Sequence, residues 1–292
     1  MGKNRRIAAG AVAAAAAALL ALAGCASAPT GDQSADRTFR YIYNTVIVTD
    51  LDPATHSSSE QIVLRNVYET LAVSAPTVVD AVRGRLSRET CDQRLESWSS
   101  HVMRNLAIAL TVRGRENLAP GTTYVVMSNH QSHYDIAVLY GILGGNVRMV
   151  AKKELFDLPV FGRAIREAGF VSVDRGNTES AIASLAGAKQ HLASGTHLWI
   201  APEGTRSPTG ELLPFKKGGF HIALDMKAPV LPITIRGTRD ALRAKGMRSR
   251  AGVEVEVTIH PPIDTKRFRG MDRKAARDAL MAEVRDAIAS AL

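Results

Sequence analysis

The alternation of short apolar runs with helix-like segments after residue 111 restricts the fold of this chain more than any other feature of its sequence. Apolar runs rich in β-branched residues, typical of strands, occupy 122–128, 147–152, 169–174, 196–202, 229–236 and 253–260. Helical patterns occupy 135–143, 161–168, 178–194 and 218–226, and an amphipathic one follows from Arg273. Parallel strands need long, usually helical crossovers. The order therefore predicts an α/β fold with a mixed, largely parallel sheet flanked by helices.

The part of the chain before residue 111 shows helical periodicity instead. Helices are predicted over 60–84 and 87–110, and the second has an apolar residue at every third or fourth position. These apolar residues are Leu95, Trp98, Val102, Leu106 and Ala109. We therefore divide the body of the chain into an N-terminal extension, 37–110, which is mainly helical, and an α/β domain, 111–292.

The first residues have the composition of a targeting segment. A positively charged start, residues 1–6, precedes an uncharged apolar run, 7–24, and small residues stand before Cys25, which is the pattern of a secretory signal peptide. The ending LAGC resembles the lipobox of bacterial lipoproteins. This resemblance implies cleavage before Cys25, lipidation of its thiol and anchorage to a membrane. Residues 25–36 would then form a polar linker.

Two alternatives stay open for this segment. Residues 7–24 can remain attached as a membrane anchor, although their length is near the minimum for a span and alanine drives insertion weakly. With either a signal or an anchor, the positive flank stays inside and the body faces away from the cytoplasm. A wrongly assigned start codon is the other alternative. Downstream, TFRYIYNTVIVTD can form a strand, and Ser57, Ser58 or Ser59 can cap the next helix.

The chain is basic, with a net charge of +9 and a pI near 9.8. A basic patch that contains a single anion, Asp240, carries much of the excess; its cations are Arg236, Arg239, Arg243, Lys245, Arg248 and Arg250. Such a patch suits a phospholipid surface or a phosphorylated substrate, and a solvated loop is the alternative. Nucleic acid is not expected, because aromatic residues make up only 5% and no zinc, zipper or RNA-binding pattern occurs.

The segment SNHQSHYD carries the main chemical pattern, an HxxxxD motif formed by His130 and Asp135. A histidine takes up a proton near neutral pH, and a carboxylate can hold its ring and stabilise the imidazolium. Five residues apart on a regular helix, the two would face different sides, but they can meet across a strand-to-helix turn. His130 and His133 also suggest a metal pair, yet spacing provides no further ligand, and the two cysteines, Cys25 and Cys91, form no metal cluster. No metal is predicted.

Three further segments place polar or proline residues at the ends of predicted strands or within them. APEGTRSPTG holds Glu203, Gly204, Thr205 and Arg206 in a turn, and a glycine-rich backbone with a guanidinium suits a phosphate. GFVSVDRGN ends a strand with Arg175, and APVLPITI contains Pro232. Taken singly, each of these is more often architecture than a binding site.

In their order and spacing, the four blocks SNHQSHYD, GFVSVDR, PEGTRS and PVLPI resemble the glycerophospholipid acyltransferase family. The connecting phrases VRGRENL, VAKKELFDLPVFG and PFKKGGFHIAL are most similar to those of bacterial 1-acyl-sn-glycerol-3-phosphate acyltransferases. The resemblance runs from about residue 98 to 240, with a looser tail to 265. It implies that the α/β domain is an acyltransferase domain.

The resemblance also implies a role for individual residues. His130 matches the general base that deprotonates the acceptor hydroxyl, and Asp135 matches the residue that orients it. Pro232 matches a position that shapes the acyl site. Residues that match acceptor-binding positions are Arg175, Glu203, Gly204, Thr205 and Arg206. Independently of the resemblance, the paired cations Lys152 and Lys153 suggest contact with a phosphate or a membrane, and a solvated surface pair is the alternative.

The implied function is an O-acyltransferase of phospholipid biosynthesis. It would move a fatty acyl group from acyl-CoA or acyl-carrier protein, as co-substrate and without a cofactor, to 1-acylglycerol-3-phosphate, and so produce phosphatidic acid. The implied partners are a membrane phospholipid surface, a lysophospholipid acceptor and acyl-carrier protein. Transfer to another lysolipid or an amino lipid is one alternative, and a non-catalytic lipid-binding lipoprotein is another. A hydrolase is less favoured, because the sequence has no GxSxG nucleophile elbow.

Two features depart from the family pattern. Ala201 stands where the third block usually has an aromatic residue before the proline. The lipobox before Cys25 is the larger departure, since an exported protein lies away from the acyl donors of the cytoplasm. An exported enzyme would need an unusual donor, such as a phospholipid.

Overall fold

The computed structural model describes residues 58–292 except 159, 174–186, 245 and 247. The signal, the linker, the strand expected in TFRYIYNTVIVTD and Arg175 lie outside the described residues. Within them, one sheet has the order β1-β7-β6-β2-β5-β3-β4. Its strands are β1 (Ala109–Arg113), β2 (Val125–Ser128), β3 (Val147–Lys152), β4 (Val171–Val173), β5 (His197–Ile200), β6 (Val230–Arg236) and β7 (Glu254–Ile259).

The pairing confirms the predicted α/β class with a mixed, largely parallel sheet. Neighbouring strands are parallel except for β6 and β7, which are antiparallel. The carboxyl ends of β2, β3, β5 and β6 therefore lie along one edge of the sheet. Ligands and catalytic groups commonly gather at this edge in parallel sheets.

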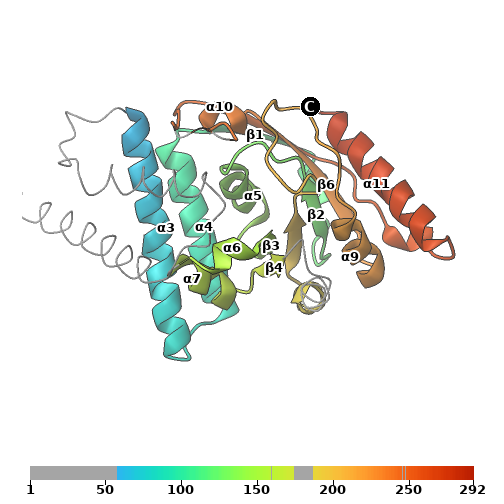
Figure 1. The fold of residues 1–292 in the computed structure, drawn as a ribbon, viewed down its shortest axis with the longest axis horizontal. Coiled ribbons are helices and arrows are strands. Elements are labelled where there is room, and N and C mark those ends of the chain that lie inside the picture. Colours follow the sequence, from blue (N-terminus) through green and yellow to red (C-terminus); the bar gives the residue numbers. More distant parts are fainter. Residues whose placement is uncertain (1–57, 159, 174–186, 245, 247) are drawn as a thin grey trace, which may run out of the picture.

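The helices cover both faces of the sheet (Figure 1). They are α3 (Ser58–Val82), α4 (Arg88–Asn105), α5 (Asp135–Leu143), α6 (Lys153–Phe156), α7 (Phe161–Glu167), α9 (Gly218–Met226), α10 (Thr238–Ala241) and α11 (Arg273–Ala289), with 3₁₀ turns at Arg115–Asn117 and Thr265–Phe268. Residues 187–193 are also helical, within the predicted range 178–194. The sequence did not predict α6 and α10, because four residues are too few to show a period.

The helix predicted over 87–110 is shorter in the structure. It begins at Arg88, after Ser87 has capped it, and ends at Asn105. Ala107 then takes a positive φ of 46°, which interrupts the helical path. From Ala109 the chain runs as β1 beside β7, so the apolar pattern that continued past residue 105 belongs to a strand.

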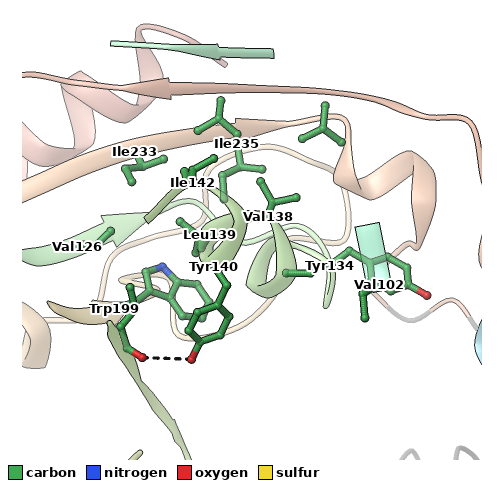
Figure 2. Close-up of a cluster of buried hydrophobic side chains, with 14 of the residues drawn as sticks. Val102, Val126, Tyr134, Val138, Leu139, Tyr140, Ile142, Trp199, Ile233 and Ile235 are labelled. Atoms are coloured by element: carbon green, nitrogen blue, oxygen red, sulfur yellow. Dashed lines mark hydrogen bonds between the residues drawn. The ribbon is translucent and has the colours of Figure 1, made fainter. Parts of the chain in front are cut away.

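Two hydrophobic clusters, one on each face, sandwich the sheet. Val126 of β2 points into the first cluster, together with α4 and α5, while Val125 and Met127 point into the second, with α9 and α11. Figure 2 shows the first cluster, in which Val138 and Leu139 of α5 lie between β6 and Trp199. β2 is thus buried on both sides, as is typical of a central parallel strand.

The helices α3 and α4 lie side by side and are attached to the rest of the fold through α5 and α7 (Figure 1). Ser99 of α4 donates to the carbonyl of Ala137 at 2.6 Å. Asn66 of α3 donates to the hydroxyl of Tyr134 at 3.1 Å, and that hydroxyl also lies 2.7 Å from Ser249 Oγ.

Among the described residues, no helix combines the length and apolar character needed to cross a membrane.

A polar clamp joins the carboxyl ends of β2 and β6. Asn129, the first residue after β2, is buried, and its side chain pairs with the backbone of Ile235. Its amide donates to the Ile235 carbonyl, and its oxygen accepts from the Ile235 N–H, both at 2.8 Å. The side chain thus continues the ladder between the two strands for one more step, and this sets where the following turn begins.

Candidate active site

His130 and Asp135 meet across the turn from β2 to α5, as the sequence predicts. His130 Nδ1 lies 2.7 Å from Asp135 Oδ2, and the histidine side chain is 15% exposed while the carboxylate is 0% exposed. An ionised carboxylate only accepts hydrogen bonds, so the proton of a neutral imidazole is on Nδ1. Nε2 is then left with a lone pair, which suits it to act as a base.

Further donors surround the Asp135 carboxylate. The backbone N–H groups of Gln131 and Ser132 donate to Oδ2 at 2.7 and 3.0 Å, and the Thr238 hydroxyl donates to Oδ1. A buried charge is costly unless it is hydrogen-bonded, and these contacts meet that need. They also fix the carboxylate against the turn, and its contact with Nδ1 orients the His130 ring.

A second buried carboxylate holds the backbone of the histidine. Glu203 is 2% exposed; its Oε1 accepts from the His130 N–H and its Oε2 from the Leu213 N–H, both at 2.8 Å. Burial raises the pKa of Glu203, although the two backbone hydrogen bonds oppose that shift. Glu203 belongs to the loop that follows β5. Ser207 of the same loop also contacts the turn of the histidine, because its N–H donates to the His130 carbonyl at 2.7 Å. Both oxygens of Glu203 therefore contact backbone, which favours a positioning role over contact with an acceptor.

Trp199 is a neighbour of the histidine that the sequence analysis did not identify. Its ring is perpendicular to that of His130, with 5.6 Å between centroids, and its Nε1 donates to Ser128 Oγ at 2.9 Å. The side chain is buried in β5 and packs in the first cluster. In the sequence, a tryptophan in an apolar strand looks like core, so no local signal distinguished it.

Arg206 places a cation close to this pair. The residue is partly buried, and its guanidinium makes no hydrogen bond within the part of the chain that the structure describes. Burial lowers its pKa, while the charge of Asp135 opposes this shift. His133 lies in the same turn and keeps an exposed surface, although other protein atoms crowd its ring. This desolvation, followed by repulsion from Arg206, lowers the pKa of His133.

The remaining predicted residues lie in the loop after β5, in β6 and where β3 ends. Gly204 and Thr205 are in the loop that carries Arg206; Gly204 takes a φ of 71° and Thr205 is exposed. Pro232 is buried in β6, opposite Met127 of β2. The exposed cations Lys152 and Lys153 stand where β3 ends and α6 begins, at the same edge of the sheet. No group of three or more His, Cys, Asp or Glu side chains among the described residues could hold a metal ion.

The described cations of the basic patch begin with Arg236, the last residue of β6, and continue in the segment after it. Arg236 pairs with Glu256 of β7 at 3.5 Å, and Arg239 donates to the Pro208 carbonyl at 3.1 Å. Ala201, which replaces the usual aromatic residue, is partly buried against the first cluster. Its small side chain leaves the loop contacts of Glu203 in place.

Comparison with known proteins relates this geometry to a family. A family model described as Acyltransferase matches residues 109–236. The 1-acyl-sn-glycerol-3-phosphate acyltransferase alpha of Ovis aries is 35% identical over 209 residues, which are 71% of this chain and 71% of the relative. The 1-acyl-sn-glycerol-3-phosphate acyltransferase of Saccharomyces cerevisiae is 34% identical over 212 residues, 70% of this chain and 69% of the relative.

A solved structure is also similar. It is the crystal structure of the 1-acyl-sn-glycerophosphate (LPA) acyltransferase, PlsC, from Thermotoga maritima. The TM-score is 0.61 at 27% sequence identity, and the match covers 79% of this chain and 97% of that chain. The fold described above, with its mostly parallel sheet and flanking helices, is thus the fold of that enzyme.

Glu203→Gln tests the buried carboxylate. A glutamine has one acceptor oxygen, so one of the two N–H groups loses its partner, and we expect the free energy of unfolding to fall by about 1–3 kcal/mol. Because the pKa of Glu203 is raised in the folded protein, the wild type binds this proton more tightly when folded. Its stability advantage over Glu203→Gln should therefore be largest below pH 4.5 and shrink as the pH rises through the folded pKa.

Urea unfolding followed by circular dichroism at several pH values measures this difference. Glu256→Gln is the control, because Glu256 is half-exposed and, among the described residues, forms an ion pair with Arg236 alone; such pairs contribute less than about 1 kcal/mol. A Glu203→Gln protein as stable as the wild type at every pH would show that the second acceptor oxygen is not needed.

Proposed function

Because this chain belongs to the family of 1-acyl-sn-glycerol-3-phosphate acyltransferases, we propose that it acylates the free hydroxyl of 1-acylglycerol-3-phosphate and so produces phosphatidic acid. The observation that carries the proposal is the contact of His130 with Asp135 at 2.7 Å, at the edge of the sheet where β2 ends. The donor is a fatty acyl thioester, acyl-CoA or acyl-carrier protein, and the reaction needs no cofactor.

The hydrogen-bonded pair of His130 and Asp135, called the dyad below, supports a general-base mechanism. His130 Nε2 removes the proton of the acceptor hydroxyl while its oxygen attacks the thioester carbonyl. Asp135 stabilises the imidazolium that forms. When the tetrahedral intermediate collapses, the carbon–sulfur bond breaks and the thiolate leaves, taking the proton from His130. The products are an ester and a free thiol, and His130 returns to its neutral form.

Binding of the acceptor phosphate is assigned to the loop beside the dyad. The guanidinium of Arg206, which makes no hydrogen bond to the described residues, can hold the phosphate oxygens in a planar fork. Gly204 and Thr205 are proposed to contribute beside it, and so is Arg175, which lies outside the described residues. Glu203 is proposed to act by holding this loop against the turn of the histidine.

The acyl chain and the membrane surface are assigned to other parts of the same edge. Pro232, in β6 next to β2, is proposed to shape the acyl site. The exposed Lys152 and the neighbouring Lys153 are proposed to contact a phosphate or a membrane surface. The basic patch that follows β6 would add attraction to anionic lipid headgroups.

Attachment to the membrane is proposed to involve a lipid on Cys25. One acyl chain holds a protein weakly, whereas a lipid together with basic residues gives stable attachment. Such a bacterial lipoprotein would meet its substrates at the membrane surface, and a phospholipid would be a suitable donor if the body is exported. An uncleaved anchor at residues 7–24 is the alternative.

Two other functions compete with the main proposal. Acylation of another lysolipid or an amino lipid would use the same dyad with a different acceptor pocket. A lipid-binding lipoprotein without activity would not need a histidine and two buried carboxylates held as closely as His130, Asp135 and Glu203. Comparing the rates with a panel of acceptors tests for acylation of another lipid. Absence of turnover with all of them would indicate the non-catalytic lipoprotein.

His130→Ala tests the reaction. We expect thiol release from acyl-CoA to require lysophosphatidic acid, and the variant to lose about 10²–10⁴-fold of the rate, the usual contribution of a general base. His221→Ala is the control, since His221 lies on α9, which packs in the second cluster, on the other face of the sheet from α5. If neither the wild type nor His130→Ala transfers an acyl group from acyl-CoA, acyl-carrier protein or phospholipid donors, the non-catalytic alternative is favoured.

Arg206→Ala tests the acceptor. We expect KM for lysophosphatidic acid to rise about tenfold or more, because a guanidinium held near a phosphate makes charge-assisted hydrogen bonds. The rate with monoacylglycerol, which lacks the phosphate, should change little. Arg163→Ala is the matched control, since Arg163 is an exposed arginine on α7. If Arg206→Ala impairs acylation of lysophosphatidic acid and of monoacylglycerol equally, Arg206 does not recognise the phosphate.

Cys25→Ser tests the anchor. In a bacterial host, we expect the wild type to be recovered with membranes as a chain that begins at a lipidated Cys25, and the variant to keep its signal and lack the lipid mass. Mass spectrometry of the intact protein reads both. A wild-type chain that retains residues 1–24 without a lipid would favour the uncleaved anchor.

A further inference from the structure

The second oxygen of the Asp135 carboxylate is held by a residue outside all four sequence blocks. Thr238 is 0% exposed, and its hydroxyl donates a hydrogen bond to Asp135 Oδ1. The other oxygen, Oδ2, receives the three donors of the turn at 130–132. Building on the function proposed above, we propose that Thr238 is a positioning residue for acyl transfer, which holds Asp135 and through it the ring of His130.

The chemistry of the partners determines the direction of this hydrogen bond. An ionised carboxylate cannot donate, so the hydroxyl of Thr238 does. Among the described residues, no other hydrogen bond reaches Oδ1, and a buried oxygen without a donor is costly. With Thr238 in place, both oxygens of Asp135 are held and the plane of the carboxylate cannot rotate away. It then accepts the Nδ1 proton of His130, and Nε2 stays available for the acceptor hydroxyl.

The local backbone directs Thr238 toward Asp135. The clamp between Asn129 and Ile235 brings the end of β6 beside the end of β2. The chain then turns at Gly237, which has a φ of 91°, and a Cβ at this position would lie 2.0 Å from the carbonyl oxygen of Glu254. A residue with a side chain does not fit there without a shift of the backbone. The turn therefore sets the place where Thr238 begins α10.

Arg239, the residue after Thr238, contacts the loop that carries Arg206, which is proposed above to bind the acceptor phosphate. Arg239 donates to the Pro208 carbonyl at 3.1 Å, two residues after Arg206 in the sequence. The short helix α10 thus touches both the carboxylate of the dyad and the loop that carries the cation. Thr238 contacts the carboxylate of Asp135, so its loss should impair proton removal by His130 more than the binding of the acceptor.

Isosteric substitution separates the hydroxyl from the shape of the side chain. Thr238→Val removes the donor, Thr238→Ser keeps it, and Thr238→Ala provides a smaller variant should valine not fold. Thr265→Val is the matched control, because Thr265 is also buried and donates to the Ala228 carbonyl at 3.1 Å, on the far face of the sheet from the dyad. Circular dichroism of each full-length variant checks the fold.

We expect Thr238→Val to lower kcat by about tenfold, with KM for lysophosphatidic acid nearly unchanged. The acidic limb of its pH–rate profile should move to lower pH. The reason is that a carboxylate that is free to rotate away from the ring stabilises the imidazolium less. Thr238→Ser and Thr265→Val should keep both the rate and the limb. A structural role alone would lower the rate without moving the limb.

An NMR measurement on histidine-labelled protein gives a readout that does not need turnover. In the wild type, the Nδ1 proton of His130 should be protected from exchange, and in Thr238→Val it should exchange faster. If His130→Ala abolishes activity but Thr238→Val keeps the wild-type rate, limb and protected proton, the inference is wrong and the proposed function stands. Equal effects of Thr238→Val, Thr238→Ser and Thr265→Val would also overturn it.

Absence of activity in the wild type would remove the proposed function and leave the NMR comparison to decide the placement of Thr238. Faster exchange in Thr238→Val but not in Thr238→Ser would then support the hydrogen bond to Asp135. Equal protection in the wild type and Thr238→Val would overturn it.

Discussion

Asp135 buries a full carboxylate at the start of α5, and a charge in that position is tolerated only where donors surround it. Its donors come from the turn after β2, from the ring of His130 and from Thr238, which follows β6. Three parts of the chain must therefore meet at one point. The clamp of Asn129 on the backbone of Ile235 brings two of them together, because it joins the ends of β2 and β6.

The histidine is held from several sides by groups of different kinds. Asp135 contacts its ring, Glu203 its backbone N–H, and Trp199 lies perpendicular to its imidazole. The burial of Glu203 raises its pKa, so the fold bears a cost for this carboxylate. A neutral glutamine would avoid the cost of charge but would lack the second acceptor oxygen. The two backbone hydrogen bonds of Glu203 offset part of this cost, and one of them holds the turn that carries His130.

Much of the fold could be predicted because its signals are local. The bounds of α5, β3 and α9 agree with those expected from periodicity and from glycine. The order of strands and helices indicated the α/β class, since parallel strands need crossovers. The errors arose where local signals are weak or continuous: α6 and α10 are too short for a period, and the apolar pattern of α4 continues into β1 without a break in composition.

The sequence by itself determined the class of the fold, the position of the HxxxxD motif and, through the order and spacing of four short blocks, the family, because each of these is a pattern along the chain. Only the tertiary structure decided which distant residues complete the site. Glu203 is 73 residues from His130, and Thr238 is 103 residues from Asp135. Their contacts follow from the order β6-β2-β5 within the sheet, which places β2 between two strands that come much later in the sequence. Pairing between distant strands depends on the packing of the whole domain, and no local pattern encodes it.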